Sequence, residues 1–272
     1  MAKFSAVKRM TNDINRLQVR QHFSCHAREY DRYAQVQRKV ATRLTELLSA
    51  QEETWSRALE VGCGTGLLSR KVVGRYPDLP VVFSDLAHGM SVATSELLPG
   101  RQICDADAAC LPFRREAFDL VISSSVYQWL DDLPAAFAEV ARVLRPGGLF
   151  ALALFGERTL YELRSSHQQA LADKLSHGQH FASRESIIRA LGQSFVPLHD
   201  SSEFEIEWHA SVVDLLRSLK KIGAQNSSRM RPTGLASRQV MQEMMSFYQR
   251  EFGSVRGIPA TYEAIYLLAR RQ

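Results

Sequence analysis

The residues with the clearest chemical potential form a glycine-rich loop at positions 62–66. Three glycines at alternate positions follow a short apolar run and precede a segment of helical length, which is the context of a nucleotide-binding loop. Without a Cβ atom, such a loop can turn tightly and let its backbone approach a ligand. The same pattern also occurs in plain strand-to-helix turns, so the neighbouring residues must decide what the loop binds.

A carboxylate, Glu60, stands at the end of the preceding apolar run. Dinucleotide sites place a pyrophosphate at the helix N-terminus, where free N–H groups favour an anion. A neighbouring carboxylate repels that pyrophosphate but accepts hydrogen bonds from the ammonium group of an amino acid. Glu60 beside the glycine loop therefore favours a nucleoside that carries a cationic amino acid over a dinucleotide.

Two further acids follow the glycine loop. Asp85 ends the second apolar run, 19 positions beyond Gly66, where a carboxylate can accept both ribose hydroxyl hydrogens. It can also cap the helix that follows. Asp107 precedes the apolar residues 111–113, a position from which an acid can accept from an adenine amino group; a surface turn is the alternative.

The order of these features within residues 58–154, with the turn at 145–148, resembles the class I S-adenosylmethionine-dependent methyltransferases. The resemblance implies S-adenosylmethionine as cofactor and S-adenosylhomocysteine as product. It places the methionine end by Glu60, the ribose by Asp85 and the adenine by Asp107. The candidate cofactor-binding residues are Tyr30, Glu60, Gly62, Cys63, Gly64, Gly66, Asp85, Leu86, Met90, Asp107, Ala108 and Ser123.

Methyl transfer from a sulfonium is an in-line displacement, so the protein mainly has to align the acceptor and exclude water. A carboxylate acceptor is already ionised, whereas a hydroxyl acceptor needs a base or a metal. No acid or histidine cluster after residues 149–154 resembles a metal site, and the four cysteines lack zinc-site spacing. The sequence thus predicts no metal, no catalytic base and an acceptor that needs little acid–base help.

A narrower resemblance extends over most of the chain. The segments 23–37, 85–90, 118–129, 159–164, 216–224 and 261–263 are similar to the malonyl-acyl-carrier-protein O-methyltransferases of biotin synthesis. This implies that the free carboxyl of a malonyl thioester is esterified on acyl carrier protein, or on coenzyme A. A free dicarboxylic acid or a quinone precursor is the alternative acceptor, and a non-catalytic ligand-binding module is a further alternative.

A malonyl carboxylate in an apolar cavity needs a partner, for which Arg and Lys are suited. We expect Arg217 to hold it, with Arg164 and Lys220 as further candidates, although helix-surface residues are the plain alternative. Tyr33 and Trp129 are candidate walls of the acceptor cavity, or core residues. An acidic carrier protein would dock near the basic residues Lys220, Lys221, Arg229 and Arg231.

The composition fits one elaborated domain. The chain has 272 residues, 45% hydrophobic content and a formal net charge of +5, with acidic and basic residues interleaved. Such interleaving is not typical of nucleic-acid binders. No apolar stretch resembles a signal peptide or reaches membrane-spanning length, so we expect a cytoplasmic protein that binds neither nucleic acid nor membrane.

These side chains need an α/β framework. Apolar runs predict strands at 58–61, 81–83, 120–122, 149–154, 204–208 and 262–269. Helical spacing of apolar residues predicts helices at 24–50, 133–144, 159–175, 183–193, 212–222 and 236–252. With the resemblance, they imply a Rossmann-like, seven-stranded class I methyltransferase sheet with helices on both faces. We expect a single domain over 1–272: an N-terminal helical arm (1–50), a cofactor-binding core (55–158), a helical insertion that covers the substrate after the fifth strand (159–200), and C-terminal strands and helices (201–272).

Overall fold

One seven-stranded sheet organises the molecule. The computed structural model describes residues 14–171, 181–224 and 238–272. The strands are β1 (Ala58–Val61), β2 (Val81–Asp85), β3 (Gln102–Asp105), β4 (Phe118–Ser124), β5 (Leu144–Phe155), β6 (Phe195–His209) and β7 (Ile258–Arg271). They lie in the order β3-β2-β1-β4-β5-β7-β6, and β7 runs antiparallel to both of its neighbours. The order reverses between β1 and β4, the point at which open α/β sheets bind ligands.

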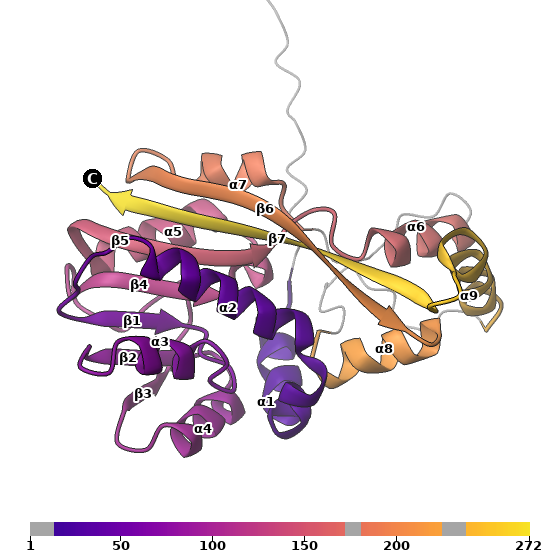
Figure 1. Cartoon of the computed structure of the whole chain (residues 1–272), viewed down its shortest axis with the longest axis horizontal. Helices are drawn as coiled ribbons and strands as arrows, with labels where there is room; N and C mark the ends of the chain where they lie inside the picture. The colour runs from indigo at the N-terminus through magenta and orange to yellow at the C-terminus, as the bar shows by residue number, and fades with distance from the viewer. Residues whose placement is uncertain (1–13, 172–180, 225–237) are drawn as a thin grey trace, which may run out of the picture.

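Helices cover both faces of the sheet (Figure 1). They are α1 (Arg16–Tyr33), α2 (Gln35–Ser49), α3 (Ser69–Arg75), α4 (His88–Leu97), α5 (Leu133–Val143), α6 (Tyr161–Ala170), α7 (Arg184–Ala190), α8 (Val212–Lys221) and α9 (Arg238–Phe252). Leu120 and Ile122 of β4 point into the hydrophobic core that contains α2, whereas Val121 points into the core that contains α5 and α7. The central strands are apolar at consecutive positions because both of their faces are buried.

The long antiparallel pair of β6 and β7 continues beyond the edge of the parallel strands toward α6, α8 and α9 (Figure 1). A buried polar contact fixes α6 to this extension, because the Glu162 carboxylate accepts from the backbone N–H and the hydroxyl of Thr261. Glu263 accepts from the backbone N–H of Arg158, and its own N–H donates to Thr159 Oγ1. The start of β7 and the start of the helical insertion therefore form one packed unit.

The predicted fold class is confirmed: the sheet has seven strands, α1 and α2 precede it, and α6 and α7 follow its fifth strand. Two elements were not predicted at their true positions. Strand β3 was missed because it is an exposed or half-buried strand at the edge of the sheet. Helix α1 begins at Arg16, eight residues before the helical spacing predicted at 24–50, and only two of its residues, Val19 and Ala27, are buried.

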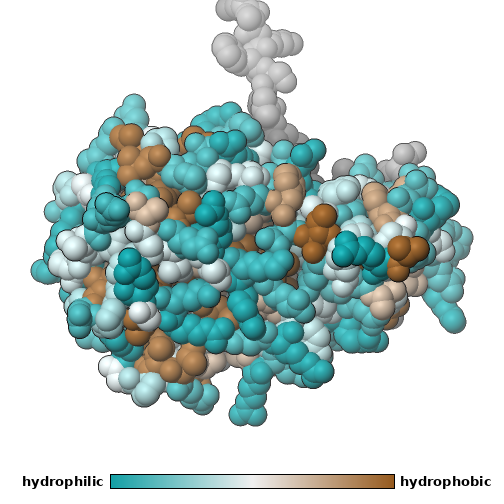
Figure 2. Space-filling model, viewed as in Figure 1, coloured by the Kyte–Doolittle hydropathy of each residue, from teal (hydrophilic) through white to brown (hydrophobic). Residues whose placement is uncertain are grey.

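Two further boundaries differ from the sequence-based expectation. Strand β6 begins at Phe195, nine residues before the strand predicted at 204–208 and inside the expected insertion 159–200. Its first half was missed because it is mostly polar or exposed and lacks an apolar run. The predicted turn at 145–148 lies inside β5, where the pairing with β4 is interrupted between Phe118 and Leu120. The face shown in Figure 2 is largely hydrophilic, with small, separate hydrophobic groups. In the described ranges, no helix is long and apolar enough to cross a membrane.

Candidate active site

The glycine loop follows β1 and has a backbone that requires glycine at two positions. Gly62 has φ +74°, and a Cβ atom there would lie 2.1 Å from Cγ2 of Val126. Gly66 has φ +88°, and its Cβ would lie 2.5 Å from Cδ2 of Leu97. Side chains from the segment after β4 and from α4 therefore occupy the space above the loop, and larger residues than glycine would displace them.

Hydrogen bonds fix this loop to both neighbouring strands. The backbone N–H groups of Gly62 and Cys63 donate to the Ser84 carbonyl in β2, at 2.7 and 2.9 Å. From the other side, the buried Ser123 hydroxyl of β4 donates to the Val61 carbonyl at 2.7 Å. The loop is thus pre-formed at the point where the strand order reverses.

Glu60 lies beneath the glycine loop and lines a cavity there. Its side chain is 1% exposed, and neither carboxylate oxygen has a hydrogen-bond partner in the described part of the chain. Burial is the main reason that the pKa of Glu60 is raised well above its usual value; the neighbouring Ser69 hydroxyl acts in the opposite direction, and the nearby charge of Asp85 adds to the rise. A buried carboxylate without partners is costly, and a cationic group in the cavity would remove that cost. Glu60 therefore fits the ammonium end of S-adenosylmethionine.

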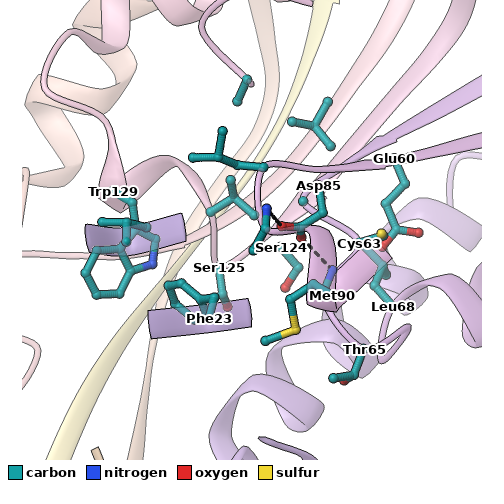
Figure 3. A pocket seen from close by; sticks show the side chains of 18 of the residues that line it. Phe23, Glu60, Cys63, Thr65, Leu68, Asp85, Met90, Ser124, Ser125 and Trp129 are labelled. Atoms are coloured by element: carbon teal, nitrogen blue, oxygen red, sulfur yellow. Dashed lines mark hydrogen bonds between the residues drawn. The ribbon is translucent and has the colours of Figure 1, made fainter. Parts of the chain in front are cut away.

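Asp85, the last residue of β2, lies on the other side of the loop (Figure 3). Its carboxylate accepts the backbone N–H of Gly64 at 2.9 Å and that of Ala87 at 2.8 Å. Burial raises the pKa of Asp85 to about 6, while these two hydrogen bonds act in the opposite direction. An ionised carboxylate offers about four acceptor positions, so the two bonds leave capacity for a ribose.

Asp107 lies at the far side of the same cavity and already has two partners. Its carboxylate accepts from the Arg16 guanidinium at 2.9 Å and from the backbone N–H of Ala109 at 2.9 Å. The first of these bonds comes from α1, so the N-terminal helix reaches across the cavity. Acceptor capacity for an adenine amino group remains on this carboxylate as well.

Helix α1 covers the cavity and packs between α4 and α8. A Cβ atom at Gly89 of α4 would lie 2.5 Å from the Ser24 carbonyl oxygen, and one at Gly223, just after α8, would lie 3.2 Å from the His22 carbonyl carbon. Both glycines therefore allow close approach of α1. They belong to the segments 85–90 and 216–224, which carried part of the narrower resemblance.

Two connected cavities lie under α1. The larger extends from Glu60 and Asp85 to Asp107. The smaller is walled by α8, β7 and the segment after β5. The two cavities share Phe23, Tyr30, Gln37, Ser125 and Trp129.

Two aromatic side chains, Phe23 and Trp129, form a wall that both cavities share. The rings of Phe23 and Trp129 meet edge to face, with centroids 5.4 Å apart and planes at 81°. Figure 3 shows Ser125 between this aromatic end and the end that holds Glu60 and Cys63. The smaller cavity is thus a side chamber that opens beside the residues following β4, and we call it the acceptor chamber.

Ten of the twelve cofactor candidates line the larger cavity: Tyr30, Glu60, Gly62, Cys63, Gly64, Asp85, Leu86, Met90, Asp107 and Ala108. The remaining two are absent from this lining: Gly66 ends the loop against Leu97 of α4, and Ser123 donates to the Val61 carbonyl just before the loop. Sequence reasoning missed Ser124 and Ser125, although their position directly after a central strand was a usable signal. It also missed Arg16, which lies outside the segment that the sequence predicted to be helical.

Two aromatic candidates for the acceptor site lie in different places. Trp129 lines both cavities. Tyr33 lines neither; it packs half-buried against the hydrophobic core, with the Arg32 guanidinium 5.8 Å from its ring centroid.

The basic candidates for the acceptor site, Arg164, Arg217 and Lys220, are not among the described residues that line the two cavities. The Arg217 side chain is 60% exposed and donates to Asp214 at 2.6 Å. Arg164 donates to the Glu157 carbonyl, and Lys220 is exposed at the end of α8. Of the expected docking residues, Lys221 pairs with Glu29, whereas Arg229 and Arg231 are outside the described residues.

The described residues contain no group of three or more His, Cys, Asp or Glu side chains that could hold a metal ion. All four cysteines are free thiols. Metal-free catalysis stays a prediction.

The sequence and the fold of this chain are similar to those of known methyltransferases. The family model described as "Methyltransferase domain" matches residues 59–152. Over 266 residues the chain is 42% identical to the malonyl-[acyl-carrier protein] O-methyltransferase of Geobacter sulfurreducens, which covers 95% of this chain and 100% of the relative. It is 32% identical to the biotin biosynthesis bifunctional protein of Teredinibacter turnerae, over 92% of this chain and 46% of that longer protein. Among solved structures, a putative methyltransferase from Bacillus halodurans shares the fold, with a TM-score of 0.61 and 16% identity over 84% of this chain and 98% of the other.

Proposed function

The chain belongs to the malonyl-[acyl-carrier protein] O-methyltransferases of the class I S-adenosylmethionine-dependent methyltransferases, and on this basis we propose which of its residues bind the cofactor and the acceptor. Its activity is S-adenosylmethionine-dependent methylation of malonyl-acyl carrier protein in biotin synthesis. The observation that carries this assignment is 42% identity along 95% of this chain and the whole of the relative.

The proposed cofactor site extends along the larger cavity. Glu60 accepts hydrogen bonds from the ammonium group, directly or through water, and Asp85 accepts those of the ribose hydroxyls. Asp107 accepts from the adenine amino group while it remains bonded to Arg16. The buried, unpartnered carboxylate of Glu60 is the structural feature that favours S-adenosylmethionine over an uncharged nucleoside.

S-adenosylmethionine supplies a methyl group on a positively charged sulfur. A carboxylate oxygen of the acceptor forms a bond to the methyl carbon as the carbon–sulfur bond breaks, which leaves a methyl ester and S-adenosylhomocysteine. No proton is transferred, so the protein has to bind, orient and exclude water rather than supply a base. Phe23 and Trp129 provide an apolar wall that suits this task.

We further propose that the carrier-protein-bound malonyl thioester is the substrate, with malonyl-coenzyme A as the alternative thioester. Methylation converts the charged end of the malonyl group into a neutral ester. The ester no longer carries the desolvation cost of a carboxylate, so an enzyme with an apolar acyl pocket can accept it. The expected cytoplasmic location stays a prediction.

The test is mass spectrometry of malonyl-acyl carrier protein after incubation with this protein and S-adenosylmethionine. We expect the malonyl group to gain one CH₂, and butyryl-acyl carrier protein, which lacks the free carboxyl, to remain unchanged. Parallel reactions contain malonyl-coenzyme A and a free dicarboxylic acid. Turnover of the free acid with no change in malonyl-acyl carrier protein would contradict the assignment and favour another small acceptor.

A further inference from the structure

Ser125 has an unusual position at the junction of the two cavities. It follows β4 directly and has φ +60°, a left-handed backbone conformation that residues other than glycine adopt rarely and with strain. Its backbone N–H donates to the Ala153 carbonyl of β5 at 2.8 Å, which fixes the conformation. The fold thus maintains a strained residue at a point that lines both cavities.

The Ser125 hydroxyl is buried and has no hydrogen-bond partner in the described part of the chain. Two other neutral polar side chains line both cavities: the Tyr30 hydroxyl and the amide of Gln37, a residue that is 8% exposed. Burial raises the pKa of Tyr30, so this hydroxyl keeps its proton. An unsatisfied buried donor such as the Ser125 hydroxyl is rare in native proteins and calls for an acceptor.

We propose that the Ser125 hydroxyl donates a hydrogen bond to the acceptor carboxylate at this junction, with Tyr30 and Gln37 as the neighbouring donors. The proposal rests on the function given above and adds a residue that touches the reacting group. It differs from the expectation that Arg217 holds the carboxylate, because Arg217 pairs with Asp214 outside both cavities.

Neutral donors also suit the chemistry better than a cation. The carboxylate is fully charged before the reaction and loses that charge as the ester forms. A guanidinium would stabilise the charged ground state more than the transition state, which lowers the rate. Among the described residues that line the acceptor chamber there is no Arg or Lys. Hydroxyl and amide donors orient the carboxylate while leaving an oxygen reactive.

The test compares Ser125→Ala and Ser125→Gly with the wild type in methylation of malonyl-acyl carrier protein. We expect kcat/KM to fall about tenfold to a hundredfold in both variants, the usual effect of losing a hydrogen bond to a charged group. Ser125→Gly removes the backbone strain, so its thermal stability should equal or exceed that of the wild type. Affinity for S-adenosylhomocysteine should stay within about twofold of wild type.

Ser95→Ala, at an exposed serine of α4, is the matched control and should leave both measurements unchanged. Wild-type kcat/KM in either Ser125 variant would overturn this inference and leave the proposed function intact. An equal loss of cofactor affinity would also overturn it, since it would indicate a structural role. A wild-type protein that fails to methylate malonyl-acyl carrier protein would overturn both the function and the inference.

Discussion

Arg16 of α1 donates to the Asp107 carboxylate at 2.9 Å, and this ion pair connects the covering helix to the sheet across the mouth of the larger cavity. The side chains are 40% and 29% exposed, so the pair contributes little to global stability, about 1 kcal/mol or less. Its effect should be on the movement of α1 rather than on folding.

We therefore expect Arg16→Ala to increase the dissociation rate of S-adenosylhomocysteine several-fold, with little change in Tm, because α1 opens more readily. Stopped-flow displacement of the bound nucleoside measures the rate. Arg28→Ala, at an exposed position on the same helix, is the control. An unchanged or slower dissociation would show that this ion pair does not restrain the cover.

Cofactor affinity should depend on pH through Asp85. Its pKa in the folded chain is about 6, and the ribose hydroxyls require the ionised form as acceptor. We expect the Kd of S-adenosylhomocysteine to rise as the pH falls below about 6, approaching tenfold per pH unit. Isothermal titration calorimetry between about pH 5 and pH 8 measures this dependence.

Asp85→Asn is the matched variant for this experiment. It should bind more weakly than the wild type at neutral pH, and its Kd should vary much less with pH because the amide does not titrate. If the variant retained the wild-type pH dependence, the titrating group would lie elsewhere in the site, and Glu60 would be the next candidate.

Glu60→Gln should change stability and binding in opposite directions. The folded chain holds the Glu60 proton more tightly than the unfolded chain does, so ionised Glu60 lowers stability at pH values above its usual 4.5. The neutral amide removes this cost, and we expect the free energy of unfolding to rise by about 1 kcal/mol or more at neutral pH, with a smaller gain in acid.

The same variant should bind S-adenosylmethionine about tenfold to a hundredfold more weakly, because the ammonium group loses a charged partner. Chemical denaturation and calorimetry measure the two effects. Glu96→Gln, at an exposed carboxylate of α4, should alter neither. Loss of stability in Glu60→Gln would contradict the description of Glu60 as a costly, unpartnered charge.

Gly89→Ala should weaken cofactor binding without touching the cofactor. The new Cβ would lie 2.5 Å from the Ser24 carbonyl oxygen, so α1 must move away from α4. We expect a loss of affinity for S-adenosylhomocysteine of about tenfold, comparable to 1.4 kcal/mol. Gly74→Ala in α3 meets no atom within 4 Å and should instead stabilise the protein by about 0.5–1 kcal/mol. Equal affinity in both variants would contradict the role given to α1.

The gathering of the cofactor candidates around one cavity was predictable because its signals are local. Glu60, the glycines and Asp85 stand at strand ends, and any parallel arrangement of these strands brings them to one edge of the sheet. Most of the fold followed from apolar runs and helical spacing for the same reason. Strand β3 and the first half of β6 lack such runs, and α1 has a largely polar surface, so periodicity could not locate them.

The acceptor half depends on contacts between residues far apart in the chain. Phe23, Ser125 and Tyr262 come together only after three separate segments have packed. The placement of Arg217 illustrates the limit of choosing residues by charge: Asp214 lies three positions earlier, a spacing that brings two side chains together on a helix surface. That spacing was visible in the sequence and favours a surface ion pair.

Helix α1 contributes Phe23 and Tyr30 to both cavities, so in the proposed binding mode the nucleoside and the acyl group share one wall. A displacement of this helix that frees one ligand also uncovers the other. The departure of ester and S-adenosylhomocysteine is then governed by a single opening rate, and a slow opening would make the enzyme sensitive to its own nucleoside product.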